Sequence, residues 1–235
     1  MVRTKRSFKD AVYGQLARAG KALSSPKRLE LLDLLSQSPR TVEALAKEAS
    51  TTVANASQHL QVLHAGGLVE AEKQGRFVCY RLADESVGRF LRTFRLLAED
   101  RLAELERMKQ RFFAGFGGAE AVDEATLLDR ARQGQAIVLD VRPNSEYHSA
   151  HLEGAISIPL EELENRLSEL PRDTDVVAYC RGPYCVLAAE AVRLLRGHGF
   201  AAHRLEASVY DWEARGLRVV RGAGRNALPS APGNC

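Results

Sequence analysis

The sequence predicts two domains: a mainly α-helical domain that carries a helix-turn-helix and a β-hairpin, followed by an α/β domain with a mostly parallel sheet. Three observations predict this. The chain has 235 residues, enough for two domains of roughly 100 residues each. Its first half shows helical periodicity that ends in two strand-like runs, whereas its second half alternates strands with helices. We expect the domains over 1–114 and 122–222.

Charge is distributed unevenly along the chain. Residues 1–116 hold 20 lysines and arginines against 13 acidic residues, and residues 117–235 hold 13 against 17. This asymmetry favours a polyanion-binding half joined to a half with another task. The alternative is an uneven scatter of solvated charges. No apolar run is long enough to span a bilayer, and the charged start lacks the apolar core of a secretory signal, so we expect the cytoplasm.

The first domain begins with helices. Apolar residues at three- and four-residue steps predict an amphipathic helix over 8–23, and Ser25-Pro26 supplies a cap and a first-turn proline for the next. A third, short helix and a polar turn precede a fourth over about 53–65, whose Val53, Leu60 and Leu63 we expect to face the core. Strand-like runs at 68–73 and 77–82 then predict a hairpin with a basic tip.

A helix-turn-helix places its second helix in the major groove, so this fourth helix should read DNA. Asn and Gln bind adenine bidentately, which makes Asn55 and Gln58 the candidates for base readout. Hydroxyl and basic side chains suit phosphates. For His59, a structural role between helices is an equal alternative. The expected DNA-binding residues are Thr52, Asn55, Ser57, Gln58, His59, Lys73 and Arg76.

From about 85 to 113 the pattern is helical again, with an apolar stripe that finds no partner in so small a domain. Such a stripe predicts a homodimer through 85–113, and packing within one chain is the alternative. Glycines then mark a linker over 115–121. Gly, Pro, Ala and Ser dominate 223–235, which we expect to form a flexible tail.

In the second domain, Cys180 ends an apolar strand and is followed by Arg181, Gly182, Pro183, Tyr184 and Cys185, and then by a helix. Backbone N–H groups and the positive helix end at such a turn lower a thiol pKa and cradle anions. We therefore expect Cys180 to be a nucleophile toward sulfane sulfur. The remaining elements predicted here are helices over about 123–133 and 160–169, one after Cys185 and one near 208–216, and strands over 136–142, 156–158, 175–180 and 200–205.

The segment ALAKEASTTVANASQHLQVLHAGGLVEAEKQGRFVCYRL resembles the core of the ArsR/SmtB family of dimeric repressors, and the likeness covers about 8–112. It implies operator DNA as the partner. Members of that family often sense metals through cysteines or Asp/His pairs. The segment 41–50 has no cysteine and the last helix has no histidine, so we expect no metal and no cofactor.

The motifs LDVR, HLEGAISIP and YCRGPYC, with the late Trp212, resemble a single-domain rhodanese over about 122–221. The likeness implies a persulfide on Cys180 within a loop of residues 180–185. It implies that Asp140 and Arg142 organise the neighbouring loop, with Glu146 as a partner for Arg142.

Several positions depart from the rhodanese pattern. Cys185 replaces an arginine that would help to hold thiosulfate. Val186 replaces the arginine of phosphatases and arsenate reductases on this fold, which disfavours their chemistry. The other departures are Ala150, Glu153 and the pair Ala207-Ser208.

The two resemblances together predict a DNA-binding regulator whose Cys180 accepts sulfane sulfur, from a donor such as thiosulfate or polysulfide, as a sulfur or redox sensor. Cys185 either attacks the modified Cys180 or only starts the next helix. Two alternatives stay open. The chain is a sulfurtransferase whose helical domain serves dimerisation, or its rhodanese-like domain binds sulfur compounds without turnover.

Overall fold

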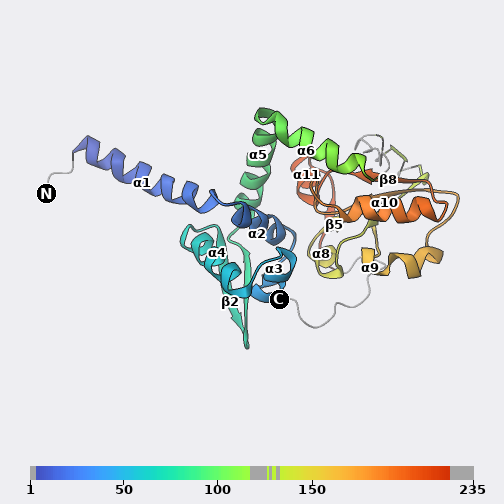
Figure 1. The fold of residues 1–235 in the computed structure, drawn as a ribbon, viewed down its shortest axis with the longest axis horizontal. Helices are drawn as coiled ribbons and strands as arrows, with labels where there is room; N and C mark the ends of the chain where they lie inside the picture. Colours follow the sequence, from blue (N-terminus) through green and yellow to red (C-terminus); the bar gives the residue numbers. More distant parts are fainter. Residues whose placement is uncertain (1–3, 117–125, 127–128, 131–132, 223–235) are drawn as a thin grey trace. The chain divides into compact units, whose positions relative to one another are not determined.

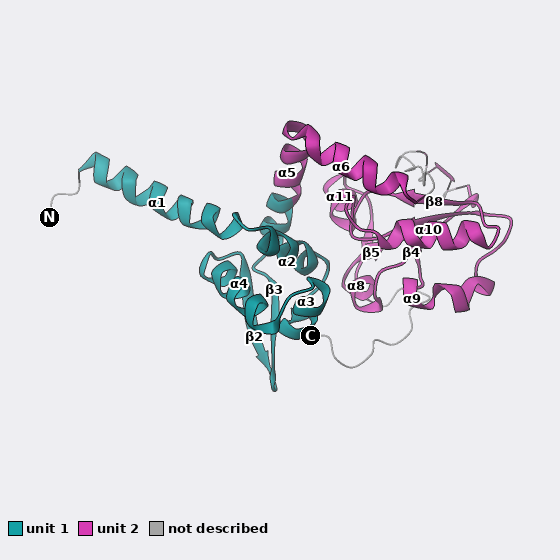
Figure 2. Cartoon of the chain, viewed as in Figure 1, with its two compact units in different colours: residues 1–91, 232–235 teal, residues 92–231 magenta. Residues whose placement is uncertain are grey.

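The computed structural model describes residues 4–116, 126, 129–130 and 133–222. The chain divides into two compact units, one within residues 1–91 and the other within 92–231 (Figure 2). The division falls inside one helix, α5 (Glu85–Arg101). The elements of unit 1 that precede α5 are α1 (Lys5–Leu23), α2 (Pro26–Gln37), β1 (Arg40–Thr41), α3 (Val42–Glu48), α4 (Val53–Ala65), β2 (Val69–Gln74) and β3 (Phe77–Leu82) (Figure 1).

Unit 1 is a winged helix-turn-helix. Its antiparallel sheet has the order β1-β3-β2, and Gly75 takes the positive φ that the tight β2–β3 turn requires. Helix α4 buries Ala56, Leu60 and Leu63, which are spaced four and three residues apart on one helical face. The expectation for Val53 is wrong. Its side chain is 47% exposed, because it lies in the first turn, before this buried face begins.

Unit 2 has an α/β fold. Its elements after α5 are α6 (Ala103–Ala114), β4 (Ala136–Asp140), α8 (Asn144–Ser149), β5 (His151–Leu152), β6 (Ile156–Ser157), α9 (Leu160–Leu163), a 3-10 helix (Glu164–Glu169), β7 (Asp175–Tyr179), α10 (Leu187–Gly197), β8 (Ala202–Leu205), α11 (Val209–Ala214) and β9 (Val219–Val220). Strands β6-β4-β7-β8 form a parallel sheet in that order, and β5 pairs antiparallel with β9. The two-domain fold class expected from the sequence is confirmed.

Side chains alternate between the two faces of this sheet. On β7, Val176 and Ala178 pack into the cluster that α10 covers, whereas Val177 and Tyr179 pack into the cluster that contains Trp212 of α11. Cys180 follows at the end of β7 and continues the first set. The alternation thus aims the Cys180 side chain toward α10.

The single helix expected over 85–113 is two helices. Leu102 has φ −114° and ψ 83°, outside the helical region, and separates α5 from α6. After this break, α6 contacts the end of β8: the Arg204 guanidinium lies 4.0 Å from the centre of the Phe113 ring, and Lys109 pairs with Glu206 at 3.2 Å. These contacts join residues of α6 to residues that lie far along the chain.

Some expectations fall outside the described residues. The linker over 115–121, the helix over 123–133 and the tail over 223–235 lie wholly or largely in the remaining stretches. Within the described ranges, no helix combines the length and apolar character needed to cross a bilayer. The same ranges contain no cluster of three or more His, Cys, Asp or Glu side chains arranged to hold a metal ion.

Candidate functional site

The candidate DNA-reading face lies at the N-terminal part of α4. Thr52 is the N-cap of this helix, and its hydroxyl accepts a hydrogen bond from the Asn55 N–H at 3.2 Å. The Asn55 and Gln58 side chains are exposed, while Ser57 and His59 are half-buried. The two amide side chains that we predict to read bases therefore point to solvent and not into the core of unit 1.

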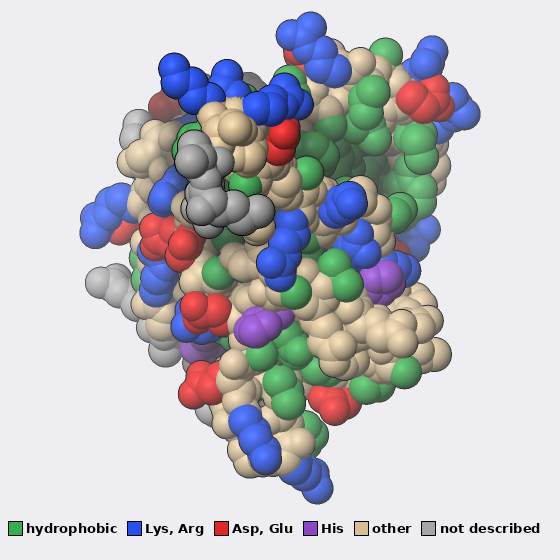
Figure 3. All heavy atoms as spheres, turned by 90° about the vertical axis from the view of Figure 1, so that its left-hand side faces the viewer, with side chains coloured by type: hydrophobic (Ala, Val, Ile, Leu, Met, Phe, Trp, Pro, Cys, Tyr) green, Lys and Arg blue, Asp and Glu red, His purple; other side chains and the backbone are tan. Residues whose placement is uncertain are grey.

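The β2–β3 hairpin adds positive charge. Lys73 and Arg76 are exposed, and the Arg76 guanidinium lies over the Phe77 ring at 4.8 Å. Figure 3 shows Lys and Arg side chains at the end of this hairpin. The hairpin tip thus offers cations to a polyanion without burying any of them.

The candidate sulfur site is the loop between β7 and α10. The Cys180 side chain is 2% exposed, and its thiol donates to the Cys185 carbonyl, with 3.6 Å between Sγ and O. Backbone N–H groups of Gly182 and Ala188 point at the Cys180 sulfur, and those of Arg181 and Leu187 point at the Cys185 sulfur. The loop therefore surrounds both sulfurs with main-chain donors, as expected from its position before a helix.

Gly182 is needed for this loop geometry. Its φ is +136°, a region that residues with a Cβ rarely adopt, and a Cβ placed there would lie 3.5 Å from that of Ser208. The following Pro183 is buried. The loop is thus curled by backbone conformation and held against the start of α11.

The two thiols of the loop differ in acidity. Burial raises the pKa of Cys180, and the neighbouring Cys185 thiol raises it further. The neighbouring Cys180 thiol lowers the pKa of Cys185, and N–H groups and the Arg181 charge act in the same direction. The expectation of a lowered Cys180 pKa is therefore wrong in this conformation, because burial outweighs the N–H groups.

Buried charged side chains form a network of hydrogen bonds and ion pairs that reaches the loop at Arg181. Arg142 donates to Asp140 at 2.7 Å and to the carbonyl of Ala150, also at 2.7 Å, and forms the expected ion pair with Glu146 at 3.8 Å. Arg181 donates to Glu146 at 2.9 Å. The carboxylates of Glu146 and Asp140 are fully buried. Arg181 is thus anchored by its carboxylate partner while its backbone N–H faces the Cys185 sulfur.

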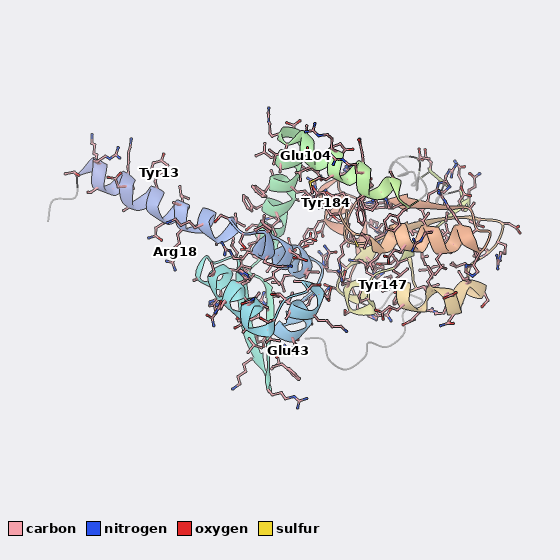
Figure 4. The ribbon with its side chains drawn as sticks, viewed as in Figure 1. Tyr13, Arg18, Glu43, Glu104, Tyr147 and Tyr184 are labelled. Carbon is pink, nitrogen blue, oxygen red and sulfur yellow. The ribbon has the colours of Figure 1, made fainter. Side chains whose placement is uncertain are left out.

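The expected loop residue Tyr184 reaches Glu99, and a capping box lies beside the loop; the sequence singled out neither Glu99 nor Asp211. Tyr184, which is labelled in Figure 4, is 51% exposed, and its hydroxyl donates to Glu99 of α5 at 2.7 Å. Ser208 and Asp211 form a capping box at the start of α11. The Ser-x-x-Asp spacing signals this box in the sequence. The contact with α5 has no local signal, since it joins segments more than 80 residues apart.

Comparison with known proteins gives separate matches for the two units. A helix-turn-helix domain family model matches residues 23–72, and a rhodanese-like domain family model matches residues 123–215. A protein named HTH-type transcriptional regulator Rv0324, from Mycobacterium tuberculosis, is 42% identical over 215 residues, which cover 92% of this chain and 94% of that protein.

Other similar proteins match one half of the chain. A protein named Sulfurtransferase, from Allochromatium vinosum, is 29% identical over 42% of this chain and 92% of its own length. The homodimeric winged helix-turn-helix DNA-binding domain of a possible ArsR-family regulator from Mycobacterium bovis is 41% identical. It covers 43% of this chain and 93% of that chain, with a TM-score of 0.40. The chain belongs to the family of HTH-type transcriptional regulators in which an ArsR/SmtB-type winged helix-turn-helix domain is joined to a rhodanese-like domain.

Proposed function

We propose that this transcriptional regulator binds operator DNA as a homodimer and changes its DNA affinity when the Cys180–Cys185 pair reacts with sulfane sulfur. One observation carries the proposal. Two cysteines share one loop of backbone N–H groups at the junction of a strand and a helix, and the Cys180 thiol donates to the Cys185 carbonyl. Main-chain N–H groups stabilise anionic sulfur, and a neighbouring thiol provides a second reaction step.

For the DNA half, we assign base readout to Asn55 and Gln58, because both side chains are exposed near the start of α4. Thr52 and Ser57 contact phosphates in this proposal, and Lys73 and Arg76 contact the backbone or minor groove from the hairpin. A regulator of this kind works where the DNA is, so we place it in the cytoplasm.

For dimerisation, exposed apolar side chains on α5 and α6 support an interface with a second copy. These side chains recur at helical spacing along one stripe. A helix face that stayed in contact with water would be expected to carry polar residues there. The exposed apolar side chains are Phe90 (45% exposed), Phe94 (40%), Leu97 (57%), Leu102 (55%), Met108 (59%) and Phe112 (53%). A second copy would cover the same patch in both chains, as two-fold symmetry requires.

The chemistry is balanced as two thiol exchanges. A cysteine thiolate attacks the outer sulfur of thiosulfate or a polysulfide, and sulfite or a shortened polysulfide leaves with the electron pair. The persulfide then stays in the N–H cradle, where transfer of its outer sulfur between Cys185 and Cys180 keeps one persulfide and one thiol. Alternatively, the other thiol attacks its inner sulfur, forming a Cys180–Cys185 disulfide and releasing hydrosulfide.

The test is a gel shift with duplex DNA from upstream of the protein's own gene, before and after treatment with polysulfide. Sulfite, which has no transferable sulfur, is the control reagent. Wild type should change its affinity after polysulfide, whereas Cys180→Ser and Cys185→Ser should not. An unchanged wild-type affinity, with mass spectrometry showing added sulfur, would refute the sensor.

A second candidate function is turnover as a sulfurtransferase, which the 29% identity to the Allochromatium vinosum protein favours. The two functions predict different kinetics. An enzyme consumes many equivalents of donor when an acceptor thiol is present, whereas a sensor stops after one equivalent per pair. Measuring sulfite released from thiosulfate over time, in wild type and in Cys180→Ser, separates them.

A further inference from the structure

We propose that α5 holds the sulfur loop shut through two contacts, Asp211 with Arg92 and Arg95, and Tyr184 with Glu99. These are positioning residues that control access to the thiol pair. A link between the thiols and DNA binding rests on the proposed function. The control of access to the thiols does not, because it involves only the loop, α11 and α5.

Asp211 uses its two carboxylate oxygens for different partners. Oδ2 accepts from the Ser208 N–H at 2.9 Å and from the Ser208 hydroxyl at 2.7 Å, which completes the capping box of α11. Oδ1 accepts from Arg92 Nε at 2.9 Å and from Arg95 Nη2 at 2.6 Å. One buried carboxylate therefore ties the start of α11 to two arginines of α5.

Ser208 connects this carboxylate to the sulfur loop. The site where a Cβ on Gly182 would stand is 3.5 Å from the Ser208 Cβ, so there is room for no more than one carbon atom between this part of the loop and the first residue of the box. A sulfur adduct that displaced Gly182 toward Ser208 would therefore meet that side chain, since close-packed groups do not move independently.

The second contact joins the loop directly to α5 through Tyr184. The Tyr184 hydroxyl donates to Glu99 at 2.7 Å, and Arg95 lies 3.4 Å from the same carboxylate oxygen. Arg95 is thus shared between Asp211 and Glu99, so the two contacts form one network along α5. The side chains of Arg92, Arg95 and Glu99 are 21–28% exposed, which limits screening by solvent.

The same helix begins in the core of unit 1. Val87 is buried in the cluster that contains Leu60 and Leu63 of the recognition helix, and Leu91 packs against that cluster. No break interrupts α5 between Glu85 and Arg101. Helix α5 therefore contributes residues to both units, Val87 and Leu91 to unit 1 and Arg92, Arg95 and Glu99 to unit 2.

The closed loop explains why Cys180 is buried and Cys185 only partly exposed while N–H donors surround both sulfurs. Reaction with a sulfur donor then requires the loop to leave α5. A sulfur adduct that fits only the released loop shifts the equilibrium between the bound and the released loop toward release. Because coupling is reciprocal, releasing α5 by mutation must make the thiols more accessible.

The test is the rate at which iodoacetamide labels Cys180 and Cys185 in the reduced, full-length protein, followed by peptide mass spectrometry. Arg92→Gln with Arg95→Gln, and separately Tyr184→Phe, should raise the rate by about tenfold, the effect of losing a charge-assisted hydrogen bond of ordinary strength. Arg101→Gln, at a side chain 74% exposed on the same helix, should stay within about twofold of wild type.

Two variants on different sides of the network guard against a folding artefact, and unchanged far-UV circular dichroism is required of both. Equal labelling rates in wild type and both variants would overturn the inference. The DNA assay is a separate arm. If polysulfide leaves wild-type DNA affinity unchanged, the proposed sensor function fails, while the labelling rates still decide whether α5 closes the loop.

Discussion

At the scale of single residues, Cys180 and Cys185 share one loop but not one reactivity. The lowered pKa of Cys185 means that its thiolate forms at a lower pH than that of an ordinary thiol, whereas the raised pKa of Cys180 keeps that group protonated. We therefore expect Cys185 to be alkylated first. Labelling as a function of pH, read by peptide mass spectrometry, should give a midpoint for Cys185 that lies below the midpoint for Cys180.

The resemblance to rhodaneses implies the opposite order, with Cys180 as the group that carries the persulfide. Labelling of Cys180 ahead of Cys185 at neutral pH would contradict our expectation and restore that order. The matched control is Cys185→Ala, which removes the neighbouring thiol that raises the pKa of Cys180. In this variant the pKa of Cys180 should fall toward the value set by burial and the N–H groups alone.

Gly182 carries a second prediction at this scale. Gly182→Ala should lower the free energy of unfolding by about 1–3 kcal/mol, because its φ of +136° is strained for alanine. Gly197→Ala is the control, since it ends a helix, has no positive φ and meets open space. It should be neutral or slightly stabilising. Urea denaturation measures both; equal effects of the two changes would show that the loop does not depend on the glycine conformation.

At the scale of elements, the recognition helix and the hairpin should respond differently to mutation. Asn55→Ala and Gln58→Ala should each cost about 1–3 kcal/mol in operator binding and leave the salt dependence unchanged. Lys73→Ala and Arg76→Ala should weaken all DNA alike and reduce the salt slope by about one each. Fluorescence anisotropy at several salt concentrations, with operator and unrelated duplexes, separates the two classes. Uniform weakening by Asn55→Ala would exclude base readout.

The same elements show what the sequence allows. Helix α4 and the strands β4 and β7 follow from periodicity, because burial on one or both faces leaves a local pattern. The break at Leu102 does not follow from periodicity, since its neighbours favour a continuous helix and the sequence carries no proline or glycine at this point. Val53 was misplaced because periodicity fixes a face but not where the core along that face begins.

For the sulfur site, sequence located the loop because Cys180 stands between an apolar strand and a helix. It did not give the ionisation order, which depends on burial and on the influence of each thiol on the other. Nor did it find Arg92 or Glu99, whose partners come from the far end of the chain. Local chemistry was predictable, and the groups that regulate access were not.

At the scale of the whole molecule, dimerisation should precede DNA binding. Phe94→Glu with Leu97→Glu places two charges on exposed apolar positions of α5, and we expect the dimer to weaken by at least about tenfold. Sedimentation velocity measures the dimer's dissociation. Operator affinity should fall in parallel, because each half-site of an operator binds the helix-turn-helix of one protomer. The control is Arg89→Glu on the exposed, charged face of the same helix. A variant that stays dimeric would place the interface elsewhere.

The buried side chain next to Asp211 offers a way to observe these events. Trp212 is the sole tryptophan of the chain, is 5% exposed, and has an indole N–H without a hydrogen-bond partner among the residues that the structure describes. Its emission should therefore be blue-shifted at rest and should redden if water reaches the start of α11. The protein thus contains its own fluorophore at the start of α11, so sulfur loading can be followed in real time without a dye.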